Sequence, residues 1–337
     1  MKKVVIVGFG FMGMTHARNV LKNKNVRLAA IVDKNTFDIS EKLKEQSGNF
    51  SVESVSADEL EGIKVYNDFD QCLQEVNPDI CIIAVHTKLH YEFAKKALEH
   101  NAHVFVEKPF CLQIEQGQSL IELAASKQKL LMVGHVVRFM SAWLALKSII
   151  EFKQYGELEF LSLSRFSGIP SWGQWKDNLA HFGSTGGALF DLVIHDIDFA
   201  QWVCGIPDDI QATYLAGKLS NYDYVSAFWK YKDQNLKVKI EGGNTFHGQY
   251  PFQASFSARF ENASVFYSST MPESLKIATD TETENMLVDD SNLGFAQELY
   301  YFFSCIEKNV LPENCLPESS LDSIKICYKH LNELKSA

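Results

Sequence analysis

The 337-residue sequence lacks several features that mark particular protein classes. No apolar stretch approaches the roughly 20 residues of a membrane span, so we expect no transmembrane segment. The 32 basic residues are outnumbered by 42 acidic ones and form no block, so nucleic acid and anionic membranes are not expected partners. The seven cysteines include no C-x-x-C pair, which argues against structural zinc and favours a reducing, cytoplasmic compartment.

The chain length favours two domains, because single hydrophobic cores rarely grow far beyond about 250 residues. Internal repeats and low-complexity segments are absent, and up to Gly134 short apolar strands alternate with helical patterns. That rhythm predicts a doubly wound parallel sheet covered by helices on both faces. Alternating, half-buried strands follow, which predict an α+β domain with a large, mostly antiparallel open sheet. We expect an α/β domain over residues 1–134 and an α+β domain over residues 135–337.

The elements expected in each domain follow from these patterns. In the first domain we expect strands at 3–8, 26–33, 63–66, 79–85, 102–107 and 130–134, and helices at 15–22, 68–76, 91–100 and 114–127. In the second we expect strands at 158–166, 210–217, 224–231, 236–243, 252–260 and 263–269, and helices at 141–152, 186–198, 294–308 and 318–334. The opening MKKVVIVGFGFMGM is interpreted as a first strand, not a signal peptide, because glycines at turn spacing interrupt its apolar run.

The stretch VGFGFMG fits the dinucleotide-binding pattern G-x-G-x-x-G with Gly8, Gly10 and Gly13. It follows an expected strand and opens an expected helix, which is the context that the pattern requires. Gly8 permits a tight turn, Gly10 a close approach of the pyrophosphate, and Gly13 close packing of helix on strand. The helix N-terminus then favours the phosphates, so we expect the backbone from Gly8 to Gly13, with Phe9, Phe11 and Met12, to contact the cofactor.

Asp33 ends the next expected strand, twenty residues after Gly13. A carboxylate at that place accepts hydrogen bonds from the adenosine ribose hydroxyls. It also repels a 2′-phosphate, which favours NAD, whereas the neighbouring cation of Lys34 leaves NADP possible.

The stretch GGALFDLVIHDID carries charge on a helix that is otherwise apolar. At about 100° per residue, Asp191, His195 and Asp198 fall within one narrow stripe, and Asp196 falls elsewhere as a bystander. Such a stripe faces either water or dedicated partners. Asp198 either stands behind His195 as a second acceptor or meets a buried backbone or arginine partner, and we favour the structural role. No further His/Cys ligand pattern supports a metal, so none is expected.

With VFVEKPF at the end of the fifth expected strand, the chain resembles the Gfo/Idh/MocA family of glucose-fructose oxidoreductase, inositol dehydrogenase and MocA. The resemblance covers essentially the whole length, through the motifs GFGFMG, VEKP, VGHVVRF and GGALFDLVIHDIDFAQWVCG. It implies that Lys108, Asp191 and His195 are the catalytic residues and that the peptide bond before Pro109 is cis.

The chemistry of alcohol oxidation suits these side chains. Hydride leaves carbon for the nicotinamide while a base removes the hydroxyl proton, and an imidazole such as that of His195 suits this task because the ordinary pKa of histidine lies near neutrality. Asp191 can orient that ring, and Lys108 can stabilise the developing alkoxide. Lysine and histidine could exchange the role of base, and we favour His195.

The resemblance also indicates secondary contacts. Around the cofactor it implies the end of the fourth strand and the fifth-strand turn, with Val85, His86, Thr87, His90, Glu107 and Lys108 as candidates, together with Trp175. His90 could equally be a helix-start histidine bonded to the backbone. Towards the substrate, in addition to Lys108, Asp191 and His195, it implies Arg138, and an aromatic face suits a sugar at Trp172, which could instead tether its loop to the core.

The leading hypothesis is an NAD(P)-dependent oxidoreductase that interconverts a secondary alcohol of a sugar or cyclic polyol with its ketone. One alternative is a catalytically silent dinucleotide-binding sensor, although Lys108, Asp191 and His195 are all retained. Another is an NAD-dependent glycoside hydrolase or lyase with transient oxidation. Residues 1–134 are then expected to be the dinucleotide-binding domain and residues 135–337 the substrate-binding and oligomerisation domain. Relatives commonly pair through the open sheet, so we expect a homodimer or homotetramer.

Overall fold

The computed structural model describes residues 1–337 except 36–37, 45–57, 170–185, 272–273, 289–292 and 337. The chain forms two compact units, Met1–His135 with Phe295–Leu321, and Val136–Gly294 with Asp322–Ala337. The break at His135 lies beside the expected boundary. Residues 295–321, which we assigned to the second domain, instead pack with the first. Among the described residues, no helix has the length and hydropathy that a membrane span requires.

The first unit contains a six-stranded parallel sheet, as the sequence predicts. Its strands are β1 (Lys2–Val7), β2 (Val26–Val32), β3 (Lys64–Tyr66), β4 (Ile80–Ile83), β5 (His103–Glu107) and β6 (Leu131–Gly134), in the order β3-β2-β1-β4-β5-β6. The strands read as continuous apolar runs because both faces are covered, and Val4–Val7 and Ile80–Ile83 are at most 1% exposed.

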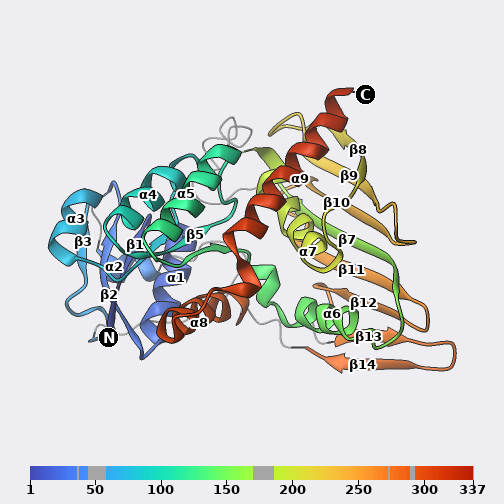
Figure 1. Ribbon diagram of the computed structural model, residues 1–337, viewed down its shortest axis with the longest axis horizontal. Coiled ribbons are helices and arrows are strands. Elements are labelled where there is room, and N and C mark those ends of the chain that lie inside the picture. Colours follow the sequence, from blue (N-terminus) through green and yellow to red (C-terminus); the bar gives the residue numbers. More distant parts are fainter. Residues whose placement is uncertain (36–37, 45–57, 170–185, 272–273, 289–292, 337) are drawn as a thin grey trace. The chain divides into compact units, whose positions relative to one another are not determined.

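Helices cover both faces of this sheet, as the doubly wound pattern requires (Figure 1). They are α1 (Phe11–Lys22), α2 (Ile39–Lys44), α3 (Phe69–Val76), α4 (His90–Glu99), α5 (Ile114–Ser126) and α8 (Leu293–Lys308), with short 3-10 turns at η1 (Asp58–Leu60), η2 (Thr87–Leu89) and η7 (Glu313–Cys315). On one face α4 lies beside α5. On the other, the Tyr300 hydroxyl of α8 donates to the Asn19 carbonyl of α1 at 3.3 Å.

The register of the central strands brings three loops to one edge. Val7 in β1 pairs with Ile83 in β4, and Ile83 pairs with Val106 in β5. The glycine turn, the end of β4 and the Lys108 turn therefore all begin at the same level of the sheet. Neighbouring strands lie about 4.8 Å apart, so these loops begin within about 10 Å of one another. This carboxyl edge is where open α/β sheets bind ligands.

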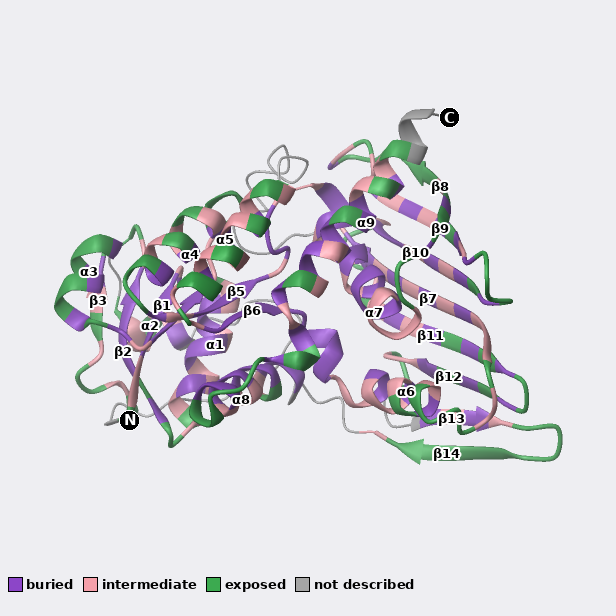
Figure 2. Cartoon of the chain, in the orientation of Figure 1, coloured by how far each residue is buried: buried purple, intermediate pink, exposed green. Residues whose placement is uncertain are grey.

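The second unit contains an eight-stranded open sheet. Its strands are β7 (Leu158–Gly168), β8 (Asp209–Leu215), β9 (Tyr224–Lys230), β10 (Lys237–Phe246), β11 (Gln253–Phe260), β12 (Ser264–Ser268), β13 (Ser274–Ala278) and β14 (Thr283–Leu287), in the order β14-β13-β12-β11-β7-β10-β9-β8. All neighbours are antiparallel except β7 and β10. The sequence patterns did not predict β13 and β14, and β14 is exposed along its length (Figure 2).

One face of the open sheet is covered by α6 (Ser141–Glu151), α7 (Ile194–Cys204) and the part of α9 (Pro317–Ser336) that belongs to this unit, from Asp322 on, with a 3-10 turn η3 (Val136–Phe139) before α6. Trp143 of α6 packs edge-on against Phe256 and Tyr267 of the sheet. The opposite face carries half-exposed side chains such as Phe228 and Phe266, 47% and 37% exposed. The alternation predicted from sequence is therefore confirmed.

Candidate active site

The glycine turn has the geometry that its pattern predicts. Gly8 adopts φ +91°, and a Cβ there would lie 2.5 Å from the Ala84 carbonyl oxygen. A Cβ on Gly13 would clash with the Gly8 carbonyl, so both glycines are needed for packing within the protein. A Cβ on Gly10 would meet nothing within 4 Å. Of the three glycines in the turn, Gly10 is the one that faces open space, which fits a position where a ligand approaches the backbone.

The first helix begins earlier than expected, at Phe11, with Gly10 as its N-cap. Gly10 offers no side-chain cap, and the first turn contains no acidic residue. A helix N-terminus of this kind attracts negative charge, because its amides point outward and its dipole is positive there. The turn therefore fits the pyrophosphate of a dinucleotide.

Asp33 is tied to the glycine turn through its carboxylate. Its Oδ2 accepts the backbone N–H of Phe9 at 2.8 Å, and its Oδ1 accepts that of Asn35 at 3.0 Å. Each carboxylate oxygen has a second lone pair, so both remain able to accept a ribose hydroxyl. Phe9 as a whole is 1% exposed, so a cofactor contact of this residue stays a prediction, while Lys34 is exposed beside Asp33.

The residues that follow β4 lie at the same carboxyl edge of the sheet as the glycine turn. Val85 and Thr87 are half-buried and His86 is exposed. These three side chains retain accessible surface, as cofactor contacts require. His90 does not, because it is 1% exposed and hydrogen-bonded on both ring nitrogens, to the Pro109 carbonyl at 2.9 Å and the Val85 carbonyl at 3.0 Å. The structure corrects the cofactor assignment of His90 in favour of the backbone-bonded alternative.

The turn after β5 holds Lys108 next to a buried carboxylate. The Lys108–Pro109 peptide bond is cis, as the resemblance implied. Glu107 Oε2 accepts the Lys108 backbone N–H at 3.1 Å, and Glu107 Oε1 is 2.6 Å from His16 Nε2 of α1. Lys108 itself is half-buried. Because Glu107 is only 6% exposed and engaged by these partners, it supports the turn, and a direct contact of its side chain with the cofactor stays a prediction.

Two residues of this unit escaped the sequence reasoning. His16, three residues after Gly13, and Glu298 of α8 are both 0% exposed and lie beside Glu107. The signal for His16 was a histidine on the apolar face of the glycine-turn helix. Glu298 could have been noticed as a carboxylate within the otherwise apolar part of α8.

In the second unit, the stretch with the polar stripe is not a regular α-helix throughout. Residues Leu189–Val193 form a π-helical segment, η6, and α7 begins at Ile194. Asp191 lies in the π-helical turn and His195 in the first turn of α7, and both side chains are half-buried. Single π-helical turns occur frequently at functional sites. Gly242 of β10 permits this segment to pack closely, since a Cβ there would lie 3.2 Å from Val193.

The prediction that Asp196 is a bystander is wrong. Asp196 is 0% exposed, and its two oxygens accept from Nε and Nη2 of Arg165 in β7, both at 2.9 Å. Burial raises the pKa of Asp196, and the Arg165 charge opposes that rise. Asp196 lies off the polar stripe because its side chain faces the sheet, where it meets Arg165.

Asp198 has the structural role that we favoured. Its oxygens accept from Nε of Arg138 at 2.7 Å and Nη2 at 2.8 Å, and the Ser323 hydroxyl of α9 donates to it at 2.9 Å. Arg138 is 0% exposed and stacks over Trp202 at 5.2 Å. This corrects the expected substrate contact of Arg138, because its guanidinium is buried against Asp198. Trp172 and Trp175 lie outside the described residues.

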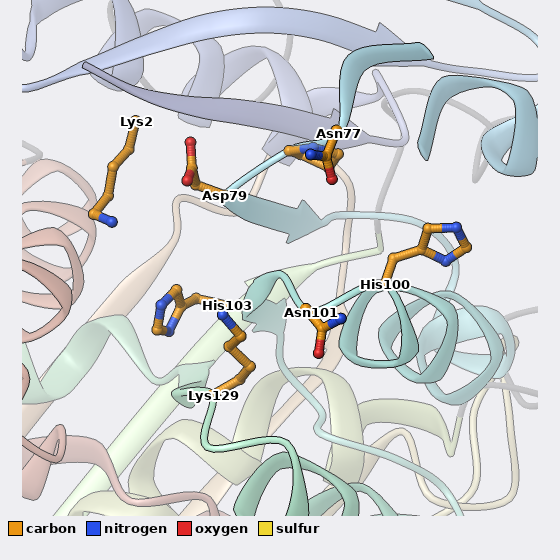
Figure 3. A pocket seen from close by; sticks show the side chains of 8 residues that line it. Lys2, Asn77, Asp79, His100, Asn101, His103 and Lys129 are labelled. Atoms are coloured by element: carbon orange, nitrogen blue, oxygen red, sulfur yellow. The ribbon is translucent and has the colours of Figure 1, made fainter. Parts of the chain in front are cut away.

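A hollow of about 360 Å³ lies at the opposite, amino-terminal edge of the first sheet. Figure 3 shows Lys2, His103 and Lys129 around it. Helices α3 and α4 end there, with Asn77 and His100 as their C-cap residues, so basic side chains complement the partial negative charge of the helix ends. Burial and the two lysines lower the pKa of His103 to about 4. The hollow is remote from the glycine turn and is not a candidate for the dinucleotide.

Comparison with known families identifies both units. A family model described as "Oxidoreductase family, NAD-binding Rossmann fold" matches residues 2–135, and one described as "GFO/IDH/MocA C-terminal domain" matches residues 143–266. The chain belongs to the Gfo/Idh/MocA family. The NAD-binding description of the first model agrees with the glycine turn, its uncapped helix and Asp33.

Curated relatives of this family member are distant. Inositol 2-dehydrogenase from Rhizobium meliloti is 24% identical over 316 residues, covering 90% of this chain and 88% of that protein. D-glucoside 3-dehydrogenase from Escherichia coli is 27% identical over 208 residues, covering 61% and 54%. The chain spans about half the length of several other relatives, such as two uncharacterized oxidoreductases from Schizosaccharomyces pombe, of which 49% and 43% are covered.

Solved structures share the fold along the whole chain. UDP-N-acetylglucosamine 3-dehydrogenase from Acidithiobacillus ferrooxidans superposes with a TM-score of 0.79 at 18% identity, covering 99% of this chain and 98% of that one. A myo-inositol dehydrogenase from Corynebacterium glutamicum gives a TM-score of 0.77 at 20% identity, covering 100% and 97%. Similarity at this level of identity establishes the fold alone.

Proposed function

We propose that this protein is an NAD(P)-dependent dehydrogenase that interconverts a secondary alcohol of a sugar or cyclic polyol with its ketone. The observation that carries the proposal is the carboxyl edge of the first sheet, where the glycine turn, Asp33 and the Lys108 turn begin at one level. The names of relatives that act on inositol and on a glucoside support the substrate class.

The cofactor assignment follows from the residues at that edge. In the proposal, the backbone from Phe9 to Gly13 holds the pyrophosphate, and Asp33 accepts the ribose hydroxyls, which favours NAD over NADP. Lys34 moderates that preference, because an exposed cation beside Asp33 can offset part of the repulsion of a 2′-phosphate. Val85, His86 and Thr87 contribute accessible side chains from the end of β4.

The chemistry that NAD supplies when bound is acceptance of a hydride from the carbon that carries the hydroxyl. The proposed tasks of this chain are binding, orientation and proton handling. Lys108 hydrogen-bonds to the reacting oxygen and stabilises its developing negative charge. His195 removes the hydroxyl proton, and Asp191 orients its ring. Asp196 and Asp198 keep the segment in place through their buried arginine partners.

We also propose that the protein pairs through the half-exposed face of its second sheet. Phe228 and Phe266 contribute exposed aromatic surface on that face, flanked by hydroxyl-bearing residues such as Ser164 and Ser255. Isologous pairing of sheet faces would bury this surface. Light scattering on the purified protein tests it, and a Phe228→Lys variant should shift the mass towards the monomer.

Cofactor binding is the first experiment for the proposal. Titration of the protein with NADH and NADPH should quench its tryptophan fluorescence with saturation, and NADH should bind more tightly. A Gly10→Glu variant is the matched control, because it places a carboxylate on the pyrophosphate position at a site with space for a side chain. Absence of saturable binding of either nucleotide by the unaltered protein would overturn the proposal.

A further inference from the structure

A cluster of three buried titratable side chains lies behind the Lys108 turn. His16 comes from α1, Glu107 from the end of β5 and Glu298 from α8. Their polar atoms lie within 4.8 Å of one another, and the three residues are 0%, 6% and 0% exposed. Nothing in the proposed reaction uses His16 or Glu298 directly, so their burial together needs a reason of its own.

The two carboxyl groups of the cluster have unequal surroundings. Glu107 is bonded to His16 Nε2 at 2.6 Å and accepts the Lys108 N–H at 3.1 Å. Neither oxygen of Glu298 has a hydrogen-bond partner among the described residues, although both are buried. A buried, unpaired carboxylate beside another carboxylate would be very costly. The cluster therefore favours a single negative charge. That charge is more stable on Glu107, whose oxygens accept hydrogen bonds, than on Glu298.

Electrostatic effects on the two groups agree with that geometry. Burial alone would raise the pKa of Glu107, but the His16 hydrogen bond and the attraction of His16 and Lys108 bring it below its ordinary value. Burial raises the pKa of Glu298 well above its ordinary value, and the charge of Glu107 adds to that rise. Both directions favour an ionised Glu107 beside a neutral Glu298.

We propose that His16, Glu107 and Glu298 form a positioning cluster for Lys108, in which His16 holds Glu107 as the single negative charge and Glu298 completes the cavity as a neutral acid. The charge acts on Lys108 in two ways. It fixes the backbone of the turn through the Lys108 N–H, and it stabilises the neighbouring ammonium group. This inference rests on the proposed role of Lys108.

The groups that act on the Glu107 charge come from four places in the fold. They are His16 of α1, His90 at the start of α4, Lys108 in the same turn and Glu298 of α8. His90 is bonded to the Pro109 and Val85 carbonyls, so altering it would disturb the turn itself. His16 bonds to the side chain of Glu107 and not to the backbone of the turn, and neither side-chain oxygen of Glu298 has a hydrogen-bond partner among the described residues, so these two are the positions to substitute.

Infrared spectroscopy tests the charge assignment without any substrate. At pH 7 the protein should show the C=O band of a protonated, buried carboxylic acid, and Glu298→Gln should remove it. Glu122→Gln, at an exposed glutamate bonded to Gln118, is the matched control and should leave the band. A band that survives in Glu298→Gln would overturn the proposal. So would a stoichiometric bound metal that Glu298→Gln abolishes, because these residue types can ligate metals.

His16 variants test the link to Lys108. His16→Leu should add a second carboxylic acid band at pH 7 and raise the acid limb of kcat/KM by about one pH unit or more, since burial then raises the pKa of Glu107 without the opposing hydrogen bond and charge of His16. His16→Gln retains an N–H donor and should return both readouts towards the unaltered protein. An unmoved acid limb in a folded His16→Leu protein would contradict the positioning role. The infrared result stands even if the proposed turnover fails, so the two failures are distinguishable.

Discussion

The carboxylate of Asp33 and the backbone N–H of Phe9 are joined by a 2.8 Å hydrogen bond between the end of β2 and the glycine turn. One side chain therefore shapes the turn that would hold the pyrophosphate and offers its remaining lone pairs to the ribose. The double role ties the conformation of the turn to the choice of nucleotide.

Asp33→Ala should weaken NAD binding about tenfold or more, because hydrogen bonds to charged groups contribute about 1.5–3 kcal/mol. NADP should lose less affinity, since the same change removes the repulsion of its 2′-phosphate. Fluorescence titrations with both nucleotides measure the two dissociation constants. Equal losses would remove Asp33 from the ribose and leave it only its role in the turn.

Substitutions at two glycines of the turn should have different effects on stability and on cofactor binding. Gly13→Ala should destabilise the protein, because its Cβ would clash with the Gly8 carbonyl, whereas Gly10→Ala has room for its Cβ and should leave the free energy of unfolding nearly unchanged. We expect Gly10→Ala to lose cofactor affinity nonetheless, because its methyl group would occupy the side from which a pyrophosphate approaches. Urea unfolding and NADH titration, run on both variants, give the comparison. Unaltered NADH affinity in Gly10→Ala would place the pyrophosphate elsewhere.

The buried Arg165–Asp196 pair should be a large contributor to the stability of the second unit. Arg165→Met leaves the Asp196 carboxylate buried without its partner and should cost about 3–5 kcal/mol in the free energy of unfolding. The double change Arg165→Met with Asp196→Leu should recover most of that loss. Arg259→Met, which breaks a pair whose arginine is 69% exposed, is the control and should cost about 1 kcal/mol or less. A small loss in Arg165→Met would show that water reaches Asp196.

His330 should make stability depend on pH in the mildly acidic range. Its Nε2 accepts the Trp229 indole N–H at 3.1 Å, so its Nδ1 carries the proton and donates to the Ile326 carbonyl at 2.9 Å. Burial lowers the pKa of His330 to about 4, below the ordinary 6.5. Between those values the unfolded chain binds more protons than the folded one, so stability is full above about pH 6.5 and falls towards pH 4.

By this linkage the His330 contribution should be about 2 kcal/mol smaller at pH 5 than at pH 8. His330→Gln keeps an acceptor and a donor but does not titrate. The difference in unfolding free energy between the two proteins should therefore change by that amount between the two pH values, as measured by urea unfolding. A difference that is independent of pH would contradict the buried neutral histidine.

Much of the fold could be predicted from the sequence, because its signals are local. The six strands of the first sheet are apolar runs in the sequence, and the spacing of its glycines predicts the glycine turn. The β13–β14 hairpin could not be predicted, since the β14 residues are all exposed and show no alternating burial. Nor could the packing of residues 295–321 with the first unit, which depends on contacts between segments far apart in the chain, such as that of Phe302 with Phe105.

The candidate site could likewise be predicted in part from the sequence. Gly8, Asp33, Lys108, Asp191 and His195 stand in motifs of fixed spacing and could be named from sequence. The partners of Asp196 and Asp198 could not, because Arg165 lies 31 residues and Arg138 60 residues away in the chain. A helical projection assigns each side chain a direction but not the residue that it meets. The π-helical turn at Leu189–Val193 further alters the angular positions assumed for Asp191.

The central claim is NAD(P)-linked oxidation of a sugar or polyol hydroxyl with Lys108 and His195 as the reacting side chains. Its most direct test is the absorbance at 340 nm when the protein, NAD or NADP and a panel of inositols, aldoses and glycosides are combined. The absorbance should rise steadily with at least one member, and Lys108→Ala and His195→Ala should each abolish the rise while still binding NADH. Constant absorbance during consumption of a glycoside, or full activity in either variant, would contradict the account.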